Sequence, residues 1–125
     1  MTSSANDVKI PITELKTIVR KGKQEEHILG TKKWLSESKK EIANGKNPKS
    51  FLFKNVDVQK LVDTYSRKDN LVYRKKSIYP IEYVTCDNII GKTFDKKFGK
   101  YINARRIAIV YSKRGVHVYP VINEE

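Results

Sequence analysis

Cysteine and histidine are both scarce in this chain of 125 residues. The single cysteine, Cys86, cannot form a disulfide within the chain, and its apolar-rich surroundings favour a small buried side chain over a nucleophile. The two histidines, His27 and His117, do not stand at the spacing of zinc ligands, with or without the cysteine. We therefore expect no disulfide, no metal site and no other cofactor.

Long apolar stretches are also absent. No uninterrupted apolar run approaches the roughly 18 residues of a membrane-spanning helix, so no membrane insertion is expected. Residues 1–7 contain neither the basic nor the apolar region of a signal peptide. No internal repeat is present. We expect a flexible N-terminus at residues 1–10, one domain over residues 11–122, and a monomer.

Acidic residues are few compared with basic ones. Lys and Arg number 26 against 14 Asp and Glu, which gives a formal net charge of +12. Residues 67–114 carry 13 of these basic residues and 4 of the acidic ones, so the positive charge is concentrated in the second half. A small, strongly basic domain attracts polyanions, which makes nucleic acid, an acidic protein and an anionic membrane surface the candidate partners.

Helical signals dominate the first third of the chain. Apolar spacing after Pro11 predicts a short helix over residues 11–20, and at least one further helical turn is expected within residues 23–30. Thr31 is a favoured N-cap, so it predicts a second helix, and the Asn-Gly pair at residues 44–45 is a typical stop.

The middle and the end of the chain change from helical to strand patterns. Residues 50–53 are a candidate strand, and a third helix, capped by Asn55 or Asp57, runs to about residue 66 with a core-facing stripe. Residues 67–76 are predicted to form a basic loop. Four strands are predicted over residues 81–85, 89–94, 105–111 and 116–121.

Short links between these strands imply an antiparallel meander. Helices that precede strands are typical of the α+β class. We therefore expect N-terminal helices packed on one face of a four-stranded antiparallel sheet, with the other face open.

The last two predicted strands form a hairpin with a histidine in it. If Gly115 takes the left-handed position of a three-residue loop, Tyr111 lies opposite His117. One face of the hairpin then carries Ile107, Ile109, Tyr111, His117 and Tyr119, beside the basic pair Arg105 and Arg106. Such a face suits a phosphate-bearing ligand. The alternative is a core hairpin with a partly buried histidine.

RNA cleavage without a metal needs a base for the 2′-hydroxyl, an acid for the leaving 5′-oxygen and a cation for the phosphate. Histidine suits both proton roles because it titrates near neutral pH. The candidate phosphate-binding cations are Lys23, Arg105, Arg106 and Lys113. The candidate hydrogen-bond donors are Thr31, Tyr111 and Ser112, and Tyr119 is a candidate stacking platform for a base. The alternative is that the two histidines have no role in catalysis.

Three motifs follow one another within residues 20–121. They are K-Q-x-x-H-I-x-G-T at residues 23–31, D-V-Q-K-L-V-D-T-Y-S at residues 57–66, and I-I-G at residues 89–91 followed by I-x-x-V-Y-S-K-x-G-x-H-x-x-P at residues 107–120. In order and spacing they resemble the polymorphic toxin type fifty domains. These are small bacterial toxin modules assigned to the barnase–EndoU–colicin–RelE group of ribonucleases.

The resemblance implies a fold of helices on a four-stranded antiparallel sheet and metal-independent ribonuclease activity. It also implies action in the bacterial cytoplasm, delivery within a larger secreted or phage-borne protein, and a dedicated immunity protein, expected to be acidic. The polar motif residues that carry over are Lys23, Gln24, His27, Thr31, Tyr111, Ser112, Lys113 and His117. The chain departs from the family at Val110, where a histidine is frequent, and at Val58, where proline is usual. Whether Arg105 or Arg106 matches the family's basic position stays open.

The first hypothesis is an endoribonuclease toxin that cleaves single-stranded RNA or a tRNA loop by 2′-hydroxyl transphosphorylation. The predicted catalytic residues are His27, His117, Lys23, Arg105, Arg106, Tyr111 and Ser112, with the acid and base roles of the histidines unassigned. The predicted substrate-binding residues are Gln24, Thr31, Lys113 and Tyr119. The alternatives are a non-catalytic nucleic-acid-binding module and a phage structural module with the same fold.

Overall fold

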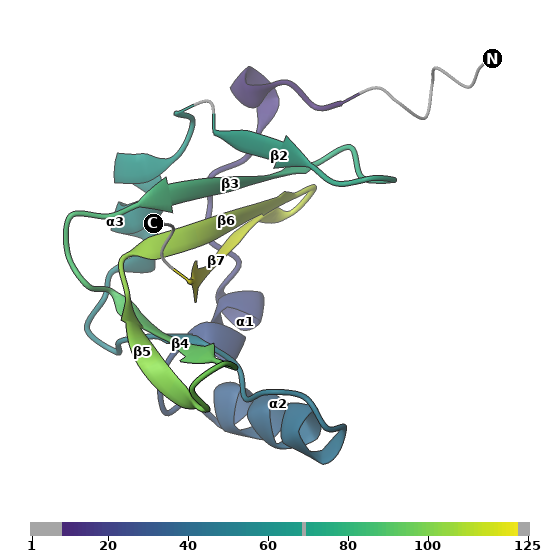
Figure 1. Ribbon diagram of the computed structural model, residues 1–125. Helices are drawn as coiled ribbons and strands as arrows, with labels where there is room; N and C mark the ends of the chain where they lie inside the picture. Colours follow the sequence, from purple (N-terminus) through teal and green to yellow (C-terminus); the bar gives the residue numbers. More distant parts are fainter. Residues whose placement is uncertain (1–8, 69, 123–125) are drawn as a thin grey trace.

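The computed structural model describes residues 9–68 and 70–122 of the chain (Figure 1). The helical segments are the 3-10 helix η2 (Ile12–Glu14), α1 (Lys21–Gln24), the 3-10 helix η3 (Glu25–His27), α2 (Lys32–Ala43) and α3 (Val58–Tyr65). The strands are β1 (Phe51–Leu52), β2 (Leu71–Tyr73), β3 (Pro80–Thr85), β4 (Gly91–Asp95), β5 (Lys100–Ala104), β6 (Arg106–Ser112) and β7 (Gly115–Val121). No helix within these residues is both long and apolar enough to cross a membrane.

The strands form two antiparallel sheets. The larger sheet has the order β2-β3-β6-β7, and the smaller has the order β1-β4-β5. Figure 1 shows α1 beside β7 and α2 beside the smaller sheet. The predicted α+β class and a four-stranded antiparallel sheet are therefore confirmed, but this sheet contains β2 in place of the strand predicted at residues 89–94, and a second, three-stranded sheet is present.

The predicted meander fails because β4 does not pair with β3. Instead β3 pairs with β6, and β4 and β5 form an inserted hairpin that belongs to the smaller sheet. Strand β5 was not predicted, and β2 lies within the segment predicted to be a basic loop. Both strands lie at the edge of their sheet, where a strand pairs on one side only and tolerates polar, charged sequence.

The main core lies between one face of the larger sheet and α3. Val58 and Val62 of α3 are buried there, as the apolar stripe predicts. They pack in one cluster with Leu15, Leu52, Cys86, Ile90, Ile107, Ile109, Tyr111, Val116 and Val118. Burial raises the pKa of the Cys86 thiol to about 11, and Asp87 adds to the effect, so this side chain is the buried apolar group expected from its context.

Two helix starts match the sequence analysis. The Thr31 side chain accepts a hydrogen bond from the Trp34 N–H at 3.0 Å, and the Asp57 carboxylate accepts one from the Lys60 N–H at 3.1 Å. Each is an N-cap bond that satisfies a backbone donor of the first turn. Asp57, rather than Asn55, is therefore the cap of α3.

The predicted helix over residues 11–20 is wrong beyond its first turn. Only η2 is helical, and the chain then becomes extended so that Val19 forms a parallel bridge with Val116 of β7. The Val116 N–H donates to the Ile18 carbonyl at 2.9 Å, and the Arg20 N–H donates to the Val116 carbonyl at 2.8 Å. These bonds cover the outer edge of β7, and this long-range pairing overrides the local helical spacing.

Two glutamine side chains complete the attachment of this segment. Gln59 of α3 accepts from the Val19 N–H at 2.9 Å and donates to the Thr17 carbonyl at 2.8 Å. Gln24 of α1 accepts from the Val118 N–H at 2.7 Å and donates to the Val118 carbonyl at 2.8 Å. The Gln24 amide thus takes the place of a neighbouring strand and holds the start of η3 against β7.

The terminal hairpin is found where the sequence predicts it, but its register differs by one residue. Ser112 pairs with Gly115, Tyr111 with Val116 and Val110 with His117. Because side chains alternate along a strand, this shift places Tyr111 on the core face and His117 on the opposite face. The predicted Tyr111–His117 pairing is therefore wrong.

Part of the predicted flexible N-terminus is attached to the body of the protein. The Lys9 ammonium donates to the Ser77 carbonyl at 2.8 Å, and the Ile10 N–H donates to the Ile78 carbonyl at 3.0 Å. The Tyr73 hydroxyl also donates to the Ile10 carbonyl at 2.7 Å. Residues 9 and 10 are thus bonded to the chain just before β3, and the remaining part of the predicted flexible segment, residues 1–8, lies outside the described residues.

Candidate functional site

A hollow of about 380 Å³ contains both histidines of the chain. Its walls come from α1 and η3, the end of α2, the loop before β1, and β7. Its lining residues are Lys23, His27, Glu41, Asn47, Lys49, Ser50, His117 and Tyr119. Larger hollows lie elsewhere on the protein, but this one gathers the groups able to move protons, and it is therefore the candidate site.

The two imidazole rings lie face to face. Their centroids are 5.7 Å apart, and the ring planes differ by 5°. The Tyr119 ring lies 5.2 Å from His27 and 6.3 Å from His117. The fold therefore brings together residues from the two ends of the chain, because Gln24, one turn before His27, is bonded to Val118 between the other two rings.

Both imidazoles have little contact with polar protein groups. His27 is only 8% exposed, and His117 is half-buried. Within the described residues the Nδ1 atoms of both rings are buried and have no hydrogen-bond partner. No carboxylate or carbonyl of the described residues therefore selects a tautomer of either ring at Nδ1.

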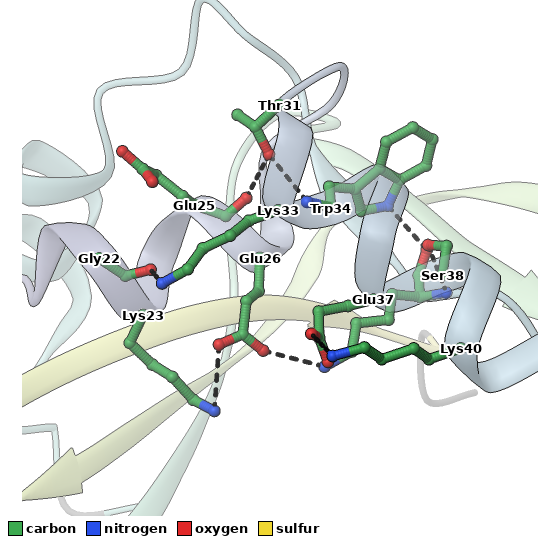
Figure 2. A network of polar contacts seen from close by, with 11 residues as sticks. Gly22, Lys23, Glu25, Glu26, Thr31, Lys33, Trp34, Glu37, Ser38 and Lys40 are labelled. Carbon is green, nitrogen blue, oxygen red and sulfur yellow. Dashed lines mark hydrogen bonds and ion pairs between the residues drawn. The ribbon is translucent and has the colours of Figure 1, made fainter.

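An ion-pair network places positive charge beside the rings. The Glu26 carboxylate lies 3.4 Å from the Lys23 ammonium and 3.2 Å from the Lys49 ammonium. Figure 2 shows the Glu26 side chain directed toward Lys23. Burial alone raises the pKa of Glu26, but the hydrogen bond from Lys49 and the charge of Lys23 hold it below its usual value. Glu26 is therefore an anion that holds two cations at the hollow.

The backbone of Lys49 is held by three side chains. Its carbonyl accepts from Trp34 Nε1 at 3.1 Å and from the Tyr101 hydroxyl at 3.0 Å, and its N–H donates to Ser38 Oγ at 3.2 Å. The loop before β1 is thereby fixed to α2 and β5. Sequence analysis assigned no role to Lys49 or Glu26, because nothing in their spacing indicates that this loop reaches the histidines.

The surroundings hold both histidines neutral at pH 7. Burial lowers the pKa of His27 to about 3, and the positive charge of Lys49 contributes. Burial lowers the pKa of His117 to about 4, with contributions from Lys23 and Arg20. The free site is thus a hollow that contains two neutral imidazoles beside two lysines and the Glu41 carboxylate.

These depressed pKa values predict a loss of stability in mild acid. Between pH 6.5 and about 4 the unfolded chain binds a proton at each histidine and the folded protein does not, so unfolding becomes more favourable as the pH falls. The free energy of unfolding should fall by up to about 1.4 kcal/mol per pH unit for each histidine, and by less for the more exposed His117. Urea denaturation at pH 6.5 and 5.0 measures this slope. His27→Gln should reduce the slope, and an unchanged slope in the His27→Gln/His117→Gln double variant would contradict the assignment.

Four of the predicted site residues line the hollow: Lys23, His27, His117 and Tyr119. Gln24 was predicted to bind substrate, but both ends of its buried amide are already bonded to Val118. Thr31 was predicted to donate to substrate, and it caps α2 instead. The Gln24 and Thr31 side chains therefore stabilise the elements that carry and flank the histidines.

The other predicted site residues lie away from the histidine pair. Ser112 Oγ donates to the Gly115 carbonyl at 2.8 Å within the hairpin turn, and Lys113 is exposed in that turn. Arg105 Nε donates to the Cys86 carbonyl at 3.1 Å, and the Arg106 guanidinium lies 5.3 Å from the centre of the Tyr83 ring. None of these side chains is part of the lining of the hollow.

Tyr111 belongs to a buried polar cluster on the opposite face of the sheet. Its hydroxyl donates to the Glu82 carboxylate at 2.6 Å. The fully buried Glu82 side chain also accepts from the backbone N–H groups of Arg67 at 2.8 Å and Lys68 at 2.6 Å. Three donors thus satisfy a carboxylate in the core, which gives Tyr111 a structural position.

Removal of the Tyr111 hydroxyl should affect stability and leave the site unchanged. Tyr111→Phe takes one of three donors from a buried carboxylate, so we expect the free energy of unfolding to fall by about 1–3 kcal/mol. Tyr73→Phe is the matched control, because it removes a hydroxyl bond to a backbone carbonyl near the surface, and it should cost about 1 kcal/mol or less. Chemical denaturation measures both. Equal losses would contradict the role of Glu82.

Comparison with known families agrees with this arrangement of motifs. No curated protein sequence matches the chain. Within the described residues no group of three or more His, Cys, Asp or Glu side chains is placed to hold a metal ion. The sequence model of the family described as Bacterial toxin 50 (Ntox50) matches residues 19–120, a span that includes η3, α3 and the terminal hairpin. The chain therefore belongs to the Bacterial toxin 50 family.

Proposed function

We propose that this toxin domain is a metal-independent endoribonuclease that cleaves RNA by transphosphorylation. The observation that carries the proposal is the stacked pair of neutral imidazoles in a hollow lined by lysines. A neutral imidazole is a general base, and a protonated one is a general acid. A hollow with two lysines at its wall suits the phosphodiester on which both would act.

The lysines and the histidines act on different parts of the reaction. In the proposed step, one neutral imidazole takes the proton of the 2′-hydroxyl, whose oxygen attacks the phosphorus. The bond from phosphorus to the 5′-oxygen breaks, and the other histidine, in its protonated form, supplies the proton that the 5′-oxygen gains. The products are a 2′,3′-cyclic phosphate and a free 5′-hydroxyl. Lys23 and Lys49 stabilise the negative charge that develops on the phosphate.

The negative charge of the RNA phosphate favours the protonated histidine that the proposed reaction needs. Both pKa values are depressed by burial and by nearby cations, so a bound phosphate raises them by offsetting the positive charge. The positive charge of His117 also lowers the pKa of His27, so only one of the two rings is expected to carry a proton. A bound phosphate therefore favours the protonated imidazole that serves as the acid.

Cleavage of a short RNA in the presence of EDTA tests the proposal. The wild-type protein should release products with 2′,3′-cyclic phosphate ends. The variants His27→Asn and His117→Asn should each lose about 100-fold or more in rate, which is the usual contribution of a general acid or base. Tyr111→Phe is the control that should cleave at the wild-type rate below its unfolding temperature. Full activity of either histidine variant would rule out the pair. RNA that is bound but left intact by the wild-type protein would favour a non-catalytic nucleic-acid-binding module.

We also propose an acidic immunity protein as the natural inhibitor and the bacterial cytoplasm as the place of action, with delivery as part of a larger secreted or phage-borne protein. The net charge of +12 supports an acidic partner, because a strongly basic domain attracts negatively charged surfaces. Expression of the wild-type domain should stop the growth of a bacterium that lacks the inhibitor. Expression of His117→Asn should not.

A further inference from the structure

A second hollow lies on the same sheet face as His117. Its volume is about 570 Å³, and it is lined by Asn70, Val72, Tyr83, Arg106, Val121 and Ile122. None of these residues takes part in the proposed cleavage step. The hollow combines an aromatic ring, a guanidinium group and an amide, which are the groups that proteins use to hold an unpaired nucleotide.

The strand register places the two hollows next to each other. Tyr83 of β3 pairs with Ala108 of β6, and Ala108 pairs with Tyr119 of β7. The two tyrosines therefore stand on one face, on either side of a small, fully buried alanine. Two strand spacings separate their backbones, which is about 10 Å. Tyr119 lines the histidine hollow and Tyr83 lines the second one.

The next row of the sheet supplies the positive charge. Arg106 pairs with Val121, one step along the face beyond the row that contains Ala108 and Tyr119. Its guanidinium lies 5.3 Å from the centre of the Tyr83 ring. A cation over an aromatic ring forms a flat surface on which a base can stack while the charge meets a phosphate.

The pKa of Tyr119 agrees with this neighbourhood. Burial raises it, Tyr83 raises it further, and the positive charge of Arg74 acts in the opposite direction. The strand register itself places Tyr83 within reach of a ligand that extends from His117 past Tyr119.

We infer that the second hollow is a nucleotide-binding subsite, in which an unpaired base stacks on Tyr83 and its phosphate contacts Arg106. This inference rests on the proposed function and names its substrate as single-stranded RNA that extends beyond the cleaved dinucleotide. Double-stranded RNA is a poor ligand for this face, because its bases are already stacked on one another and cannot lie on the tyrosines.

Binding of RNA of two lengths to cleavage-deficient protein tests the subsite. In a His117→Asn background, fluorescence anisotropy with labelled single-stranded pentanucleotide and dinucleotide gives the two dissociation constants. Tyr83→Leu should weaken pentanucleotide binding about fivefold or more, which is the usual loss of one base stack, and change dinucleotide binding less than twofold. Tyr83→Phe keeps the ring and should bind both as the parent protein does. Arg106→Gln should lower the salt dependence of pentanucleotide binding by the equivalent of about one phosphate contact.

The outcomes separate this inference from the proposed function. Cleavage by the wild-type protein together with unchanged pentanucleotide binding in Tyr83→Leu would overturn the subsite and leave the ribonuclease intact. Selective loss of pentanucleotide binding in Tyr83→Leu would support the subsite even if the wild-type protein cleaves no RNA. An equal loss for both lengths would overturn the subsite as well, because it would indicate damage at the histidine hollow. Thermal unfolding of each variant shows whether the fold is retained.

Discussion

Gly115→Ala should unfold with a free energy lower by about 3–5 kcal/mol than that of the wild-type protein. A Cβ atom at this position would lie 2.3 Å from the Ile18 carbonyl oxygen, which is too close for any side chain. The backbone φ of +133° also lies in a region that residues other than glycine rarely adopt. Backbone strain and a backbone clash therefore act together, and neither is relieved by the rotation of a side chain.

The substitution should also separate the elements that form the site. Ile18 and Arg20 bond to Val116, the residue after Gly115, and α1 begins at the next residue after this segment. A displaced segment carries Lys23 and His27 away from His117. We therefore expect Gly115→Ala to lose the proposed RNA cleavage even at temperatures at which it stays folded.

Gly99→Ala and Gly45→Ala are the matched controls. Both glycines have positive φ, +66° and +78°, but no atom of the described residues lies within 4 Å of the place that an alanine Cβ would take at either. These variants carry the strain without the clash, so each should cost only about 1–2 kcal/mol. Urea denaturation compares the three. If Gly115→Ala loses no more stability than the controls, the contact with Ile18 does not hold the segment.

Gln24→Glu should also be strongly destabilising, with a loss of about 3 kcal/mol or more in the free energy of unfolding. The change keeps the size and shape of the side chain. It replaces the amide donor with an oxygen that faces the Val118 carbonyl, and it puts a negative charge in a place that is 4% exposed. The Val118 N–H keeps an acceptor, but the carbonyl loses its donor and meets like charge.

The proposed cleavage activity of Gln24→Glu should fall together with its stability, because the bonds between the Gln24 amide and Val118 hold η3 next to β7. A shift of this helix changes the 5.7 Å spacing of the two imidazoles. The chemical shifts of the imidazole protons report that change directly, and they should move in Gln24→Glu but not in Tyr111→Phe. Wild-type shifts and cleavage in Gln24→Glu would show that other contacts position His27.

Gln59→Glu is the control for the chemistry of the substitution. Gln59 accepts from Val19 and donates to Thr17 much as Gln24 bonds to Val118, but in a partly buried place, and its amide also donates to the exposed Asp63 carboxylate at 3.0 Å. Water can solvate the new carboxylate there, so the cost should be about 1–2 kcal/mol. Cleavage should be retained, since this bond lies away from the hollow.

Local patterns predicted the features that depend on neighbouring residues. Thr31 was identified as a cap, and Asp57 as one of two candidate caps, because an N-cap bonds to a backbone group only three residues away. The position of the hairpin was predicted because its turn and its two β-rich arms adjoin. Its register was not, because two- and three-residue loops both fit residues 113–115.

The candidate site was predicted only in part. The family motifs singled out Lys23, His27 and His117, and the structure brings their side chains to one hollow. They also singled out Tyr111, Ser112 and Thr31, whose side chains instead support the fold. A family motif contains residues of the candidate site and residues that stabilise the fold, and a single sequence does not show which residue has which role. Lys49 was missed because its position depends on bonds from Trp34 and Tyr101.

The sequence by itself determined the charge, the capped helices, the β-rich second half and the pair of histidines available for chemistry. The tertiary structure decided which side chains share a face, the extended path of residues 18–20, and the neutral state of both imidazoles. The division follows the range of the interactions. Caps and turns depend on bonds between near neighbours, whereas strand edges, burial and electrostatic fields depend on residues brought together from opposite ends of the chain.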